Sequence, residues 1–456
     1  MDAARNLVQP KQGETPQKAA GLYQTFWRWH FYAGILFAPF LIVLSISGAL
    51  YLYQAEIETM LYKDKLVVQD SGAALPLSEQ VAAVKREFPK AEIGSIRLPK
   101  EADRTTQVKV TENDVTTRVY VNPYNAKITG TILDEKHFTN VAAKLHSEWI
   151  VGGTFVNRFV ELAACWTVIL LITGLYIWWP RNRKSIWGTV LPRFSQKGRT
   201  FWRDMHAVPA FWLSLLILVL IVTGLPWSGV MGEGINKIAT SSNTGYPVYA
   251  FMPPKSDTAT KDVADDVPWA AENVPVPKSG AENGGLDVDQ VTALAVKENI
   301  QKPYTISLPE GKDGVFTISS SRDKPENEAT VYFDQYSGKV VEDVRFSDYG
   351  WMAKAVSIGI ALHEGRYFGL ANQLLGTVAA LGLVGIVISS LVMWRIRKPK
   401  GKLGAPQKNG KVKPMVILGM AAAGVVMPLA GLSFIVVYVM DRFVFRRIKP
   451  LKSWLY

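Results

Sequence analysis

Apolar and polar residues alternate along this chain on a long scale. Five apolar stretches, approximately Phe31–Tyr53, Phe155–Trp179, Val208–Val230, Leu370–Trp394 and Met415–Met440, are separated by polar segments. About 20 apolar residues are enough for a helix to cross a bilayer, and Trp and Tyr gather at the ends of these stretches, as in interfacial aromatic belts. The first stretch is too long for a cleaved signal peptide and follows a polar tail of about 25 residues. The pattern predicts an integral membrane protein with five spans.

The two long polar loops, roughly 55–154 and 231–369, carry the same order of elements. A helical stretch, Ser78–Phe88 in the first loop and Val288–Asn299 in the second, precedes segments with the alternation typical of strands. We therefore expect two α+β modules of about 60 residues, each with one helix packed on a small antiparallel sheet.

The last two strands of each module have similar sequences. They are Val119-Tyr-Val-Asn-Pro-Tyr-Asn-Ala-Lys-Ile128 and Val331-Tyr-Phe-Asp-Gln-Tyr-Ser-Gly-Lys-Val340. Both patterns indicate a strand, a tight turn and a strand, with Asn125 or Gly338 as turn residues. Residues 240–285, rich in Ser, Thr, Pro, Asp and Gly, are typical of a flexible linker.

The predicted fold is a membrane α-helical bundle in which four core spans form two span–module–span repeats, followed by a fifth span. The expected segments are a tail (1–25), span 1 (26–54), module 1 (55–145), span 2 (146–180), a basic loop (181–205), span 3 (206–230), linker and module 2 (231–362), span 4 (363–395), a basic loop (396–413) and span 5 with the tail (414–456).

The basic residues predict the orientation in the membrane. The short loops after the second and fourth spans are rich in Lys and Arg, whereas the first long loop is balanced and the second is acidic. The positive-inside rule then places the N-terminus and both short loops in the cytoplasm and the modules outside. Five spans would put the C-terminal tail outside, although that tail is basic. The net charge of +12 follows from this topology and implies no nucleic-acid partner.

Four of the five histidines occupy matching places. His30 and His206 each begin an apolar stretch, 18 residues before Gly48 and Gly224, while His146 and His363 each precede the next one. Polar ionisable groups beside lipid are costly and tend to be functional. Axial ligation of two haems explains the arrangement best. The fifth histidine, His137, falls outside the pattern and is expected at the surface.

Topology pairs the histidines. His30 and His206 lie at the cytoplasmic ends of their spans, and His146 and His363 lie at the external ends. An 18-residue helical segment is about 27 Å long, close to the hydrocarbon thickness. We therefore expect two bis-histidine haem sites, one near each face, that transfer electrons across the membrane. Imidazole also suits zinc or copper, but no cluster of carboxylates or cysteines completes such a site, and Cys165 is the only cysteine.

Haem propionates need cationic partners near the interface. Arg28 and Arg203, with Arg181, are the candidates inside, and Arg158, with Lys144 and Arg366, are the candidates outside. Small residues allow close approach of a porphyrin or of a neighbouring helix, and the sequence does not separate these roles. They are Gly34, Gly48, Gly174, Gly224 and Gly376. Glu148 and Glu364, beside the outer histidines, are expected to be solvated.

The chain resembles a known family. The repeated module is similar to the PepSY domain. The segments Trp27-Arg-Trp-His-Phe-Tyr-Ala-Gly34, Leu145-His146 and Thr173-Gly-Leu-Tyr-Ile-Trp-Trp179 resemble the PepSY-associated transmembrane family. That resemblance implies a multi-pass protein of the bacterial inner membrane, in a family that includes siderophore-iron reductases with haem b. One departure is Ser389-Ser390 in the fourth span, where the second span has Thr173-Gly174.

The leading hypothesis is a ferric reductase that passes electrons to an external ferric siderophore or other iron complex. The acidic second loop favours a cationic or neutral complex. No Gly-rich nucleotide motif is evident, so a quinol in the membrane or a separate dehydrogenase must donate the electrons. Two alternatives remain: a peptide-binding or regulatory PepSY protein, and a transporter of haem or of an iron complex, for which broken and charged spans would be typical.

Overall fold

The computed structural model describes residues 16–69, 72–149, 151–180, 186–247, 255–280, 284–321, 324–406 and 414–455. The chain forms two compact units. The first, called the helical unit, contains residues 1–42, 159–218 and 382–456. The second contains residues 43–158 and 219–381 and is called the outer unit after the side that the positive-inside rule predicts for its modules. Four long helices each contribute one part to each unit.

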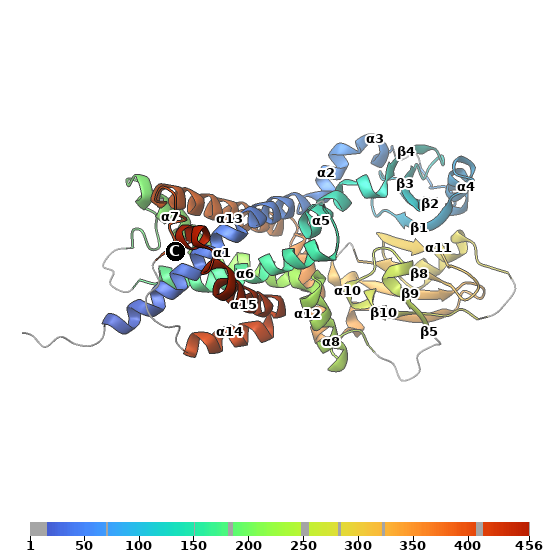
Figure 1. Cartoon of the computed structure of the whole chain (residues 1–456). Coiled ribbons are helices and arrows are strands. Elements are labelled where there is room, and N and C mark those ends of the chain that lie inside the picture. Colours follow the sequence, from blue (N-terminus) through green and yellow to red (C-terminus); the bar gives the residue numbers. More distant parts are fainter. Residues whose placement is uncertain are drawn as a thin grey trace, which may run out of the picture. The chain divides into compact units, whose positions relative to one another are not determined.

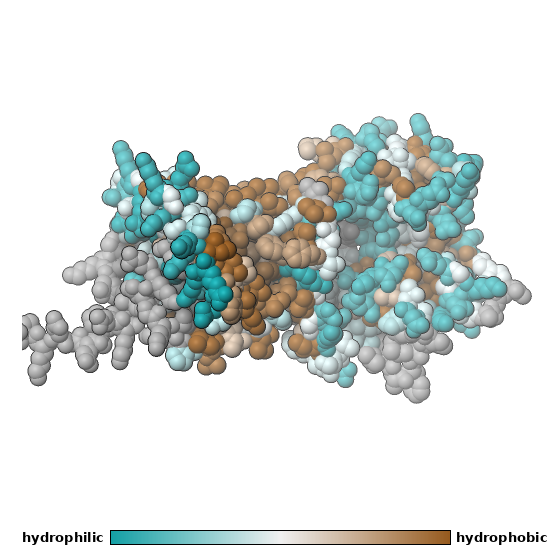
Figure 2. All heavy atoms as spheres, in the orientation of Figure 1, coloured by the Kyte–Doolittle hydropathy of each residue, from teal (hydrophilic) through white to brown (hydrophobic). Residues whose placement is uncertain are grey.

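Five helices among the described residues are long and apolar enough to cross a membrane. The spans lie in α1 (Pro16–Tyr51), α6 (Thr154–Trp178), α7 (Gly198–Gly224), α13 (Leu370–Arg397) and the segment Pro428–Phe445. Apolar side chains gather on the surface of these helices (Figure 2), and Leu36, Leu215 and Leu381 are each more than half exposed. A helix surface of this kind is stable in lipid, which fits a membrane protein.

The predicted fifth span is not one continuous helix. It consists of α14 (Pro414–Val426) and α15 (Pro428–Met440), which are separated at Met427 and pack on one another (Figure 1). Proline cannot donate the hydrogen bond that would continue α14. The two helices approach closely at glycines, since a Cβ on Gly431 would lie 2.7 Å from the Cα of Gly424. We call this pair the C-terminal hairpin.

The residues after the hairpin return to the start of the helical unit. The chain passes through a π-helix (Asp441–Phe445) to α16 (Lys449–Leu455). The Leu403 N–H donates to the Trp454 carbonyl at 2.9 Å, and the Tyr32 hydroxyl donates to the Leu455 carbonyl at 2.8 Å. The basic tail therefore lies beside the basic loop that follows α13.

Each predicted module has one helix and four strands in the outer unit. The first module contains α4 (Leu77–Glu87), β1 (Glu92–Leu98), β2 (Thr106–Glu112), β3 (Val115–Val121) and β4 (Ile128–Leu133). The second contains α11 (Val288–Lys297), β7 (Tyr304–Ser307), β8 (Val315–Ser320), β9 (Ala329–Asp334) and β10 (Val340–Arg345). Both helices lie where the sequence predicted them. The final turn of the first module has its positive φ at Ala126, not at Asn125, whereas Gly338 fills that role in the second.

The two modules are not separate sheets. Strand β1 pairs antiparallel with β7, with Ile96 opposite Ile306, so that all eight strands form one sheet in the order β10-β9-β8-β7-β1-β2-β3-β4. Helices α4 and α11 pack on the same face, and one buried core contains residues of both modules, among them Val84, Val291 and Ile306. Strand alternation directs the polar residues Arg97, Lys109 and Arg118 to the opposite face.

The expected flexible linker is ordered over residues 255–280, so that prediction was wrong there. This segment contains β5 (Lys255–Ala259), α9 (Thr260–Val263), α10 (Trp269–Glu272) and β6 (Pro275–Pro277), and its Ala271 side chain is fully buried. Trp269 anchors it by donating a hydrogen bond to the Pro226 carbonyl. Residues 248–254 and 281–283 lie outside the described residues.

Shorter helices connect the modules to the spans in the outer unit. They are α2 (Gln54–Leu61), α3 (Lys63–Leu66), α5 (Phe138–Glu148), α8 (Val230–Ser241) and α12 (Trp351–His363), with 3-10 turns at Asp134–Lys136, Leu225–Trp227, Pro325–Asn327 and Phe346–Asp348. His146 and His363 lie near the ends of α5 and α12, so each outer histidine is on a short helix that precedes a span.

Candidate functional site: two histidine pairs and an outer cavity

The first histidine pair lies in the helical unit. The ring centres of His30 on α1 and His206 on α7 lie 6.2 Å apart, with ring planes at 78°. His30 Nδ1 lies 3.0 Å from Thr173 Oγ1 of α6, and His206 Nδ1 lies 2.9 Å from the Ile386 carbonyl oxygen of α13. Four helices thus build this site, two with a histidine and two with its hydrogen-bond partner.

The second histidine pair lies in the outer unit and repeats this geometry. The ring centres of His146 and His363 are again 6.2 Å apart, with ring planes at 66°. His146 Nδ1 lies 3.0 Å from Ser47 Oγ of α1, and His363 Nδ1 lies 2.8 Å from the Leu220 carbonyl oxygen of α7. The pairing predicted from topology is therefore present in both units.

The hydrogen bonds fix the tautomer of all four rings. The Thr173 hydroxyl donates to the Ile169 carbonyl and the Ser47 hydroxyl to the Val43 carbonyl, each at 2.7 Å, so each hydroxyl oxygen accepts from Nδ1–H. His206 and His363 must also donate from Nδ1, because a carbonyl only accepts. Nε2 then carries the free lone pair on every ring. This is the usual arrangement for a metal-binding histidine, whose second nitrogen donates to a protein group.

The spacing within each pair fits one metal ion between two rings. A metal–imidazole bond is about 2.0–2.1 Å long, and two such bonds with the half-widths of two rings place the ring centres roughly 6 Å apart. Within the part of the chain that the structure describes, no group of three or more His, Cys, Asp or Glu side chains is arranged to hold a metal ion. Among the described residues, each pair offers two histidine ligands.

The outer histidines are neutral at physiological pH. Burial, followed by the repulsion of His363, lowers the pKa of His146 to about 4. Burial also lowers the pKa of His363, although its hydrogen bond to Leu220 acts in the opposite direction. A neutral imidazole is the form that binds a metal.

Three of the five small residues contact histidine rings. A Cβ on Gly174 would lie 3.0 Å from His30 Cε1, one on Gly48 would lie 3.2 Å from His146 Cε1, and one on Gly224 would lie 2.7 Å from His363 Cε1. Gly376 instead packs against Leu52, and Gly34 has no neighbour within 4 Å. The glycines at the ends of α1, α6 and α7 therefore make room for an imidazole. No such glycine contacts His206 among the described residues. Its Nδ1 instead lies 2.9 Å from the Ile386 carbonyl oxygen, three residues before Ser389-Ser390, which stand where the second span has Thr173-Gly174.

The three arginines proposed as propionate partners have different surroundings. Arg203 lies one helical turn before His206, is half exposed, and pairs with the fully buried Asp204 at 2.6 Å. Arg28 donates to the Pro406 carbonyl at 2.7 Å and to Tyr32, and lies about 200° around α1 from His30. Arg158 donates to Asn157, and its guanidinium occupies the place that a Cβ of Gly229 would take. Of the three, Arg203 lies on the same side of its helix as the histidine. Arg181 lies outside the described residues.

Two sequence expectations near these sites were wrong. His137 is buried, with 2% of its surface exposed, and its Nδ1 lies 3.1 Å from Glu58 Oε1. Glu364, which follows His363, is not solvated: it accepts from Arg366 Nε at 2.6 Å and from the Tyr51 hydroxyl at 3.5 Å. The pairing of His137 with Glu58 and that of Glu364 with Tyr51 have no local sequence signal, because the partners are far apart in the chain.

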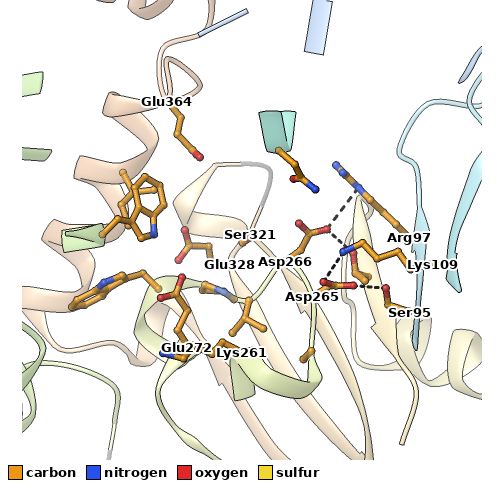
Figure 3. A pocket seen from close by; sticks show the side chains of 18 of the residues that line it. Ser95, Arg97, Lys109, Lys261, Asp265, Asp266, Glu272, Ser321, Glu328 and Glu364 are labelled. Atoms are coloured by element: carbon orange, nitrogen blue, oxygen red, sulfur yellow. Dashed lines mark hydrogen bonds and ion pairs between the residues drawn. The ribbon is translucent and has the colours of Figure 1, made fainter. Parts of the chain in front are cut away.

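A charged cavity of about 390 Å³ lies in the outer unit (Figure 3). Its walls come from the polar face of the sheet, from the ordered segment 255–280 and from α12 with the residues after it. Asp265 and Asp266 of that segment contact Lys109 and Arg97 on the strands. Glu364 also lines the cavity, which therefore reaches the residue next to His363. Sequence reasoning missed this site, because it treated its central segment as a linker.

Comparison with known proteins identifies the family to which the chain belongs. No curated protein matches the chain significantly. Residues 27–397 match the family described as the PepSY-associated TM region. The match includes both histidine pairs and both modules, and it ends before the C-terminal hairpin. A match over most of the sequence, together with five apolar helices and the sheet domain, shows that this multi-pass membrane protein belongs to the PepSY-associated transmembrane family.

Proposed function

We propose that this protein is a transmembrane oxidoreductase with two b-type haems that passes electrons from the cytoplasmic side to an external ferric complex. The substrate proposed is a ferric siderophore, and the proposed role is iron uptake across a bacterial inner membrane. One observation carries the proposal: two histidine pairs in two units share a ring spacing of 6.2 Å and the same use of Nδ1.

The donor set suits haem better than a bare metal ion. Zinc and copper sites in proteins use three or four protein ligands, whereas a porphyrin needs only two axial ligands from the protein. His30 with His206, and His146 with His363, would be those ligands. Haem held by two imidazoles supplies one-electron transfer. The protein fixes both rings through their Nδ1 hydrogen bonds, so the ligands need little rearrangement.

Two helices connect the pairs through the chain. Helix α1 carries His30 and also Ser47, the acceptor for His146, while α7 carries His206 and also Leu220, the acceptor for His363. This sharing supports a transmembrane path, because the same helices hold one ligand of the inner pair and orient one ligand of the outer pair.

The outer cavity supports an external acceptor. Its lining includes Glu364, adjacent to His363, and its size lies within the range of small-molecule sites. The electron donor is proposed to be a membrane quinol or a separate dehydrogenase, since the chain has no nucleotide-binding motif.

The test is an absorbance spectrum of the detergent-purified protein, oxidised and dithionite-reduced, with haem quantified as its pyridine complex. We expect two haems per chain in the native protein and one in each double variant, H30A/H206A and H146A/H363A. H137A is the control, because His137 pairs with Glu58 and should leave both haems in place. Unchanged haem content in both double variants would falsify the ligand assignment. Ferric complexes are then tested as oxidants of the reduced protein.

A further inference from the structure

Most charges that line the outer cavity are already paired. Lys109 lies 2.9 Å from Asp265, Arg366 lies 2.6 Å from Glu364, and Arg97 lies 3.9 Å from Asp266. Arg118 pairs closely with Asp134. These pairs neutralise the strand side of the cavity, so it offers little net attraction to an anion.

Two carboxyl groups of the lining are only partly engaged. Glu328 is 3% exposed, and its Oε2 has no partner in hydrogen-bonding geometry; its Oε1 lies 4.0 Å from Arg366. Glu272, on α10, also lines the cavity, where the Trp227 side chain donates to it and Lys261 lies near. Both side chains turn into the cavity in Figure 3. A buried acceptor without a partner costs free energy unless a ligand or water satisfies it.

A third polar group lies beside Glu328, close enough to lower the pKa of that carboxyl group. Ser357, on α12, is 1% exposed and lines the cavity, and its hydroxyl lacks a partner in hydrogen-bonding geometry. Two carboxyl groups and a hydroxyl from three separate elements thus offer acceptors to one space. Three acceptors that converge match the three N–H donors of a primary ammonium group.

We propose that Glu272, Glu328 and Ser357 form a recognition point for a protonated primary amine carried by the external ligand. The inference rests on the proposed function for the identity of that ligand as a ferric complex, and it adds the chemical group by which the complex is selected. The neutralised strand side accommodates the uncharged remainder of the ligand, and the two carboxylates disfavour anionic complexes.

Ionisation of the two carboxyl groups gives the site a pH dependence. Burial raises the pKa of Glu272 to about 7, against Lys261 and Trp227, and burial raises the pKa of Glu328 to about 7, against Ser357 and Arg366. The acids Glu364 and Glu326 also raise the pKa of Glu328. The other charged groups that line the cavity include two ion pairs, Lys109 with Asp265 and Arg97 with Asp266. The ionised carboxylates bind the ammonium group, so affinity increases as pH rises through about 7.

The experiment is isothermal titration calorimetry of the full-length protein with two gallium(III) trihydroxamate complexes. One carries a terminal primary amine and the other is its N-acetylated form. Gallium(III) is not reduced, so binding is measured independently of electron transfer. We expect the amine complex to bind at least about tenfold more tightly at about pH 8, with a smaller preference at about pH 6. The variant E272Q/E328Q should lose the preference, while E326Q, an exposed neighbour of Glu328, should retain it.

Equal affinity for both complexes, no binding of either, or a preference that survives in E272Q/E328Q would overturn the inference. Thermal unfolding of each variant establishes that the folded protein is titrated. The two proposals fail separately. Reduction of both ferric complexes at equal rates would remove the recognition point and leave the reductase. An amine preference in a chain without haem would keep the recognition point and remove the reductase.

Discussion

At the scale of single residues, the histidines depend on neighbours that are not ligands. Each ring is oriented by a hydroxyl or carbonyl oxygen at Nδ1, and three rings rest on a glycine. The structure explains the small-residue pairs that lie about 18 residues after His30 and His206. Ser47-Gly48 and Thr223-Gly224 do not serve the histidine of their own helix. They hold the outer histidines, which come from α5 and α12.

Substitution of Gly224 by Ala tests this role. The added methyl group would lie 2.7 Å from His363 Cε1, so the ring must move. We expect G224A to lose about 1–3 kcal/mol of stability and to lower haem content toward one per chain. G34A is the control, because no atom lies within 4 Å of its Cβ position. Haem content and thermal unfolding are measured for both, and identical haem content in the two variants would count against the glycine's role.

At the scale of secondary-structure elements, β1 and β7 join the modules. Their pairing turns two four-stranded sheets into one, and the core beneath α4 and α11 is continuous across the junction. The sequences of β1 and β7 do not predict that these two strands pair, because an antiparallel edge strand can pair with any exposed strand of suitable register.

Replacement of Ile306 by Ala should therefore weaken both modules together. Ile306 is fully buried in β7 and opposite Ile96 in β1. We expect a loss of about 2–5 kcal/mol, with faster amide hydrogen exchange in β1 and β2 as well as in β7 and β8. V115A, at a half-exposed position in β3, should change exchange little. If I306A affected only the second module, the two modules would be independent folding units.

At the scale of the whole molecule, the C-terminal hairpin brings the last described residues back beside α1 and the loop after α13. Helix α14 has 13 residues, about 20 Å, which is shorter than the hydrocarbon thickness of about 30 Å, whereas α15 continues into the π-helix as the apolar segment Pro428–Phe445. The Trp454–Leu403 hydrogen bond and the Leu455–Tyr32 hydrogen bond hold the tail beside the loop after α13. Trp166 of α6 donates to Ser433 at 2.9 Å and fixes the hairpin against the spans.

Accessibility of introduced cysteines tests this topology. In a C165A background, we expect S453C and K402C to react with a membrane-impermeant maleimide from the same face, and V115C from the opposite face. All three positions are exposed, so lack of reaction reports the side of the membrane. Labelling is compared in right-side-out and inverted vesicles. Reaction of S453C together with V115C would show that the segment after residue 414 crosses the membrane.

The sequence by itself determined the first four spans, the helix and strands of each module, the pairing of the histidines and the family. These features depend on local periodicity, on length and on topology, all of which are written in consecutive residues. Only the tertiary structure decided the Nδ1 partners, the β1–β7 junction, the hairpin and the cavity. Each of these joins residues far apart in the chain, and polar or Pro-rich segments such as 255–280 carry no periodicity that distinguishes an ordered wall from a linker.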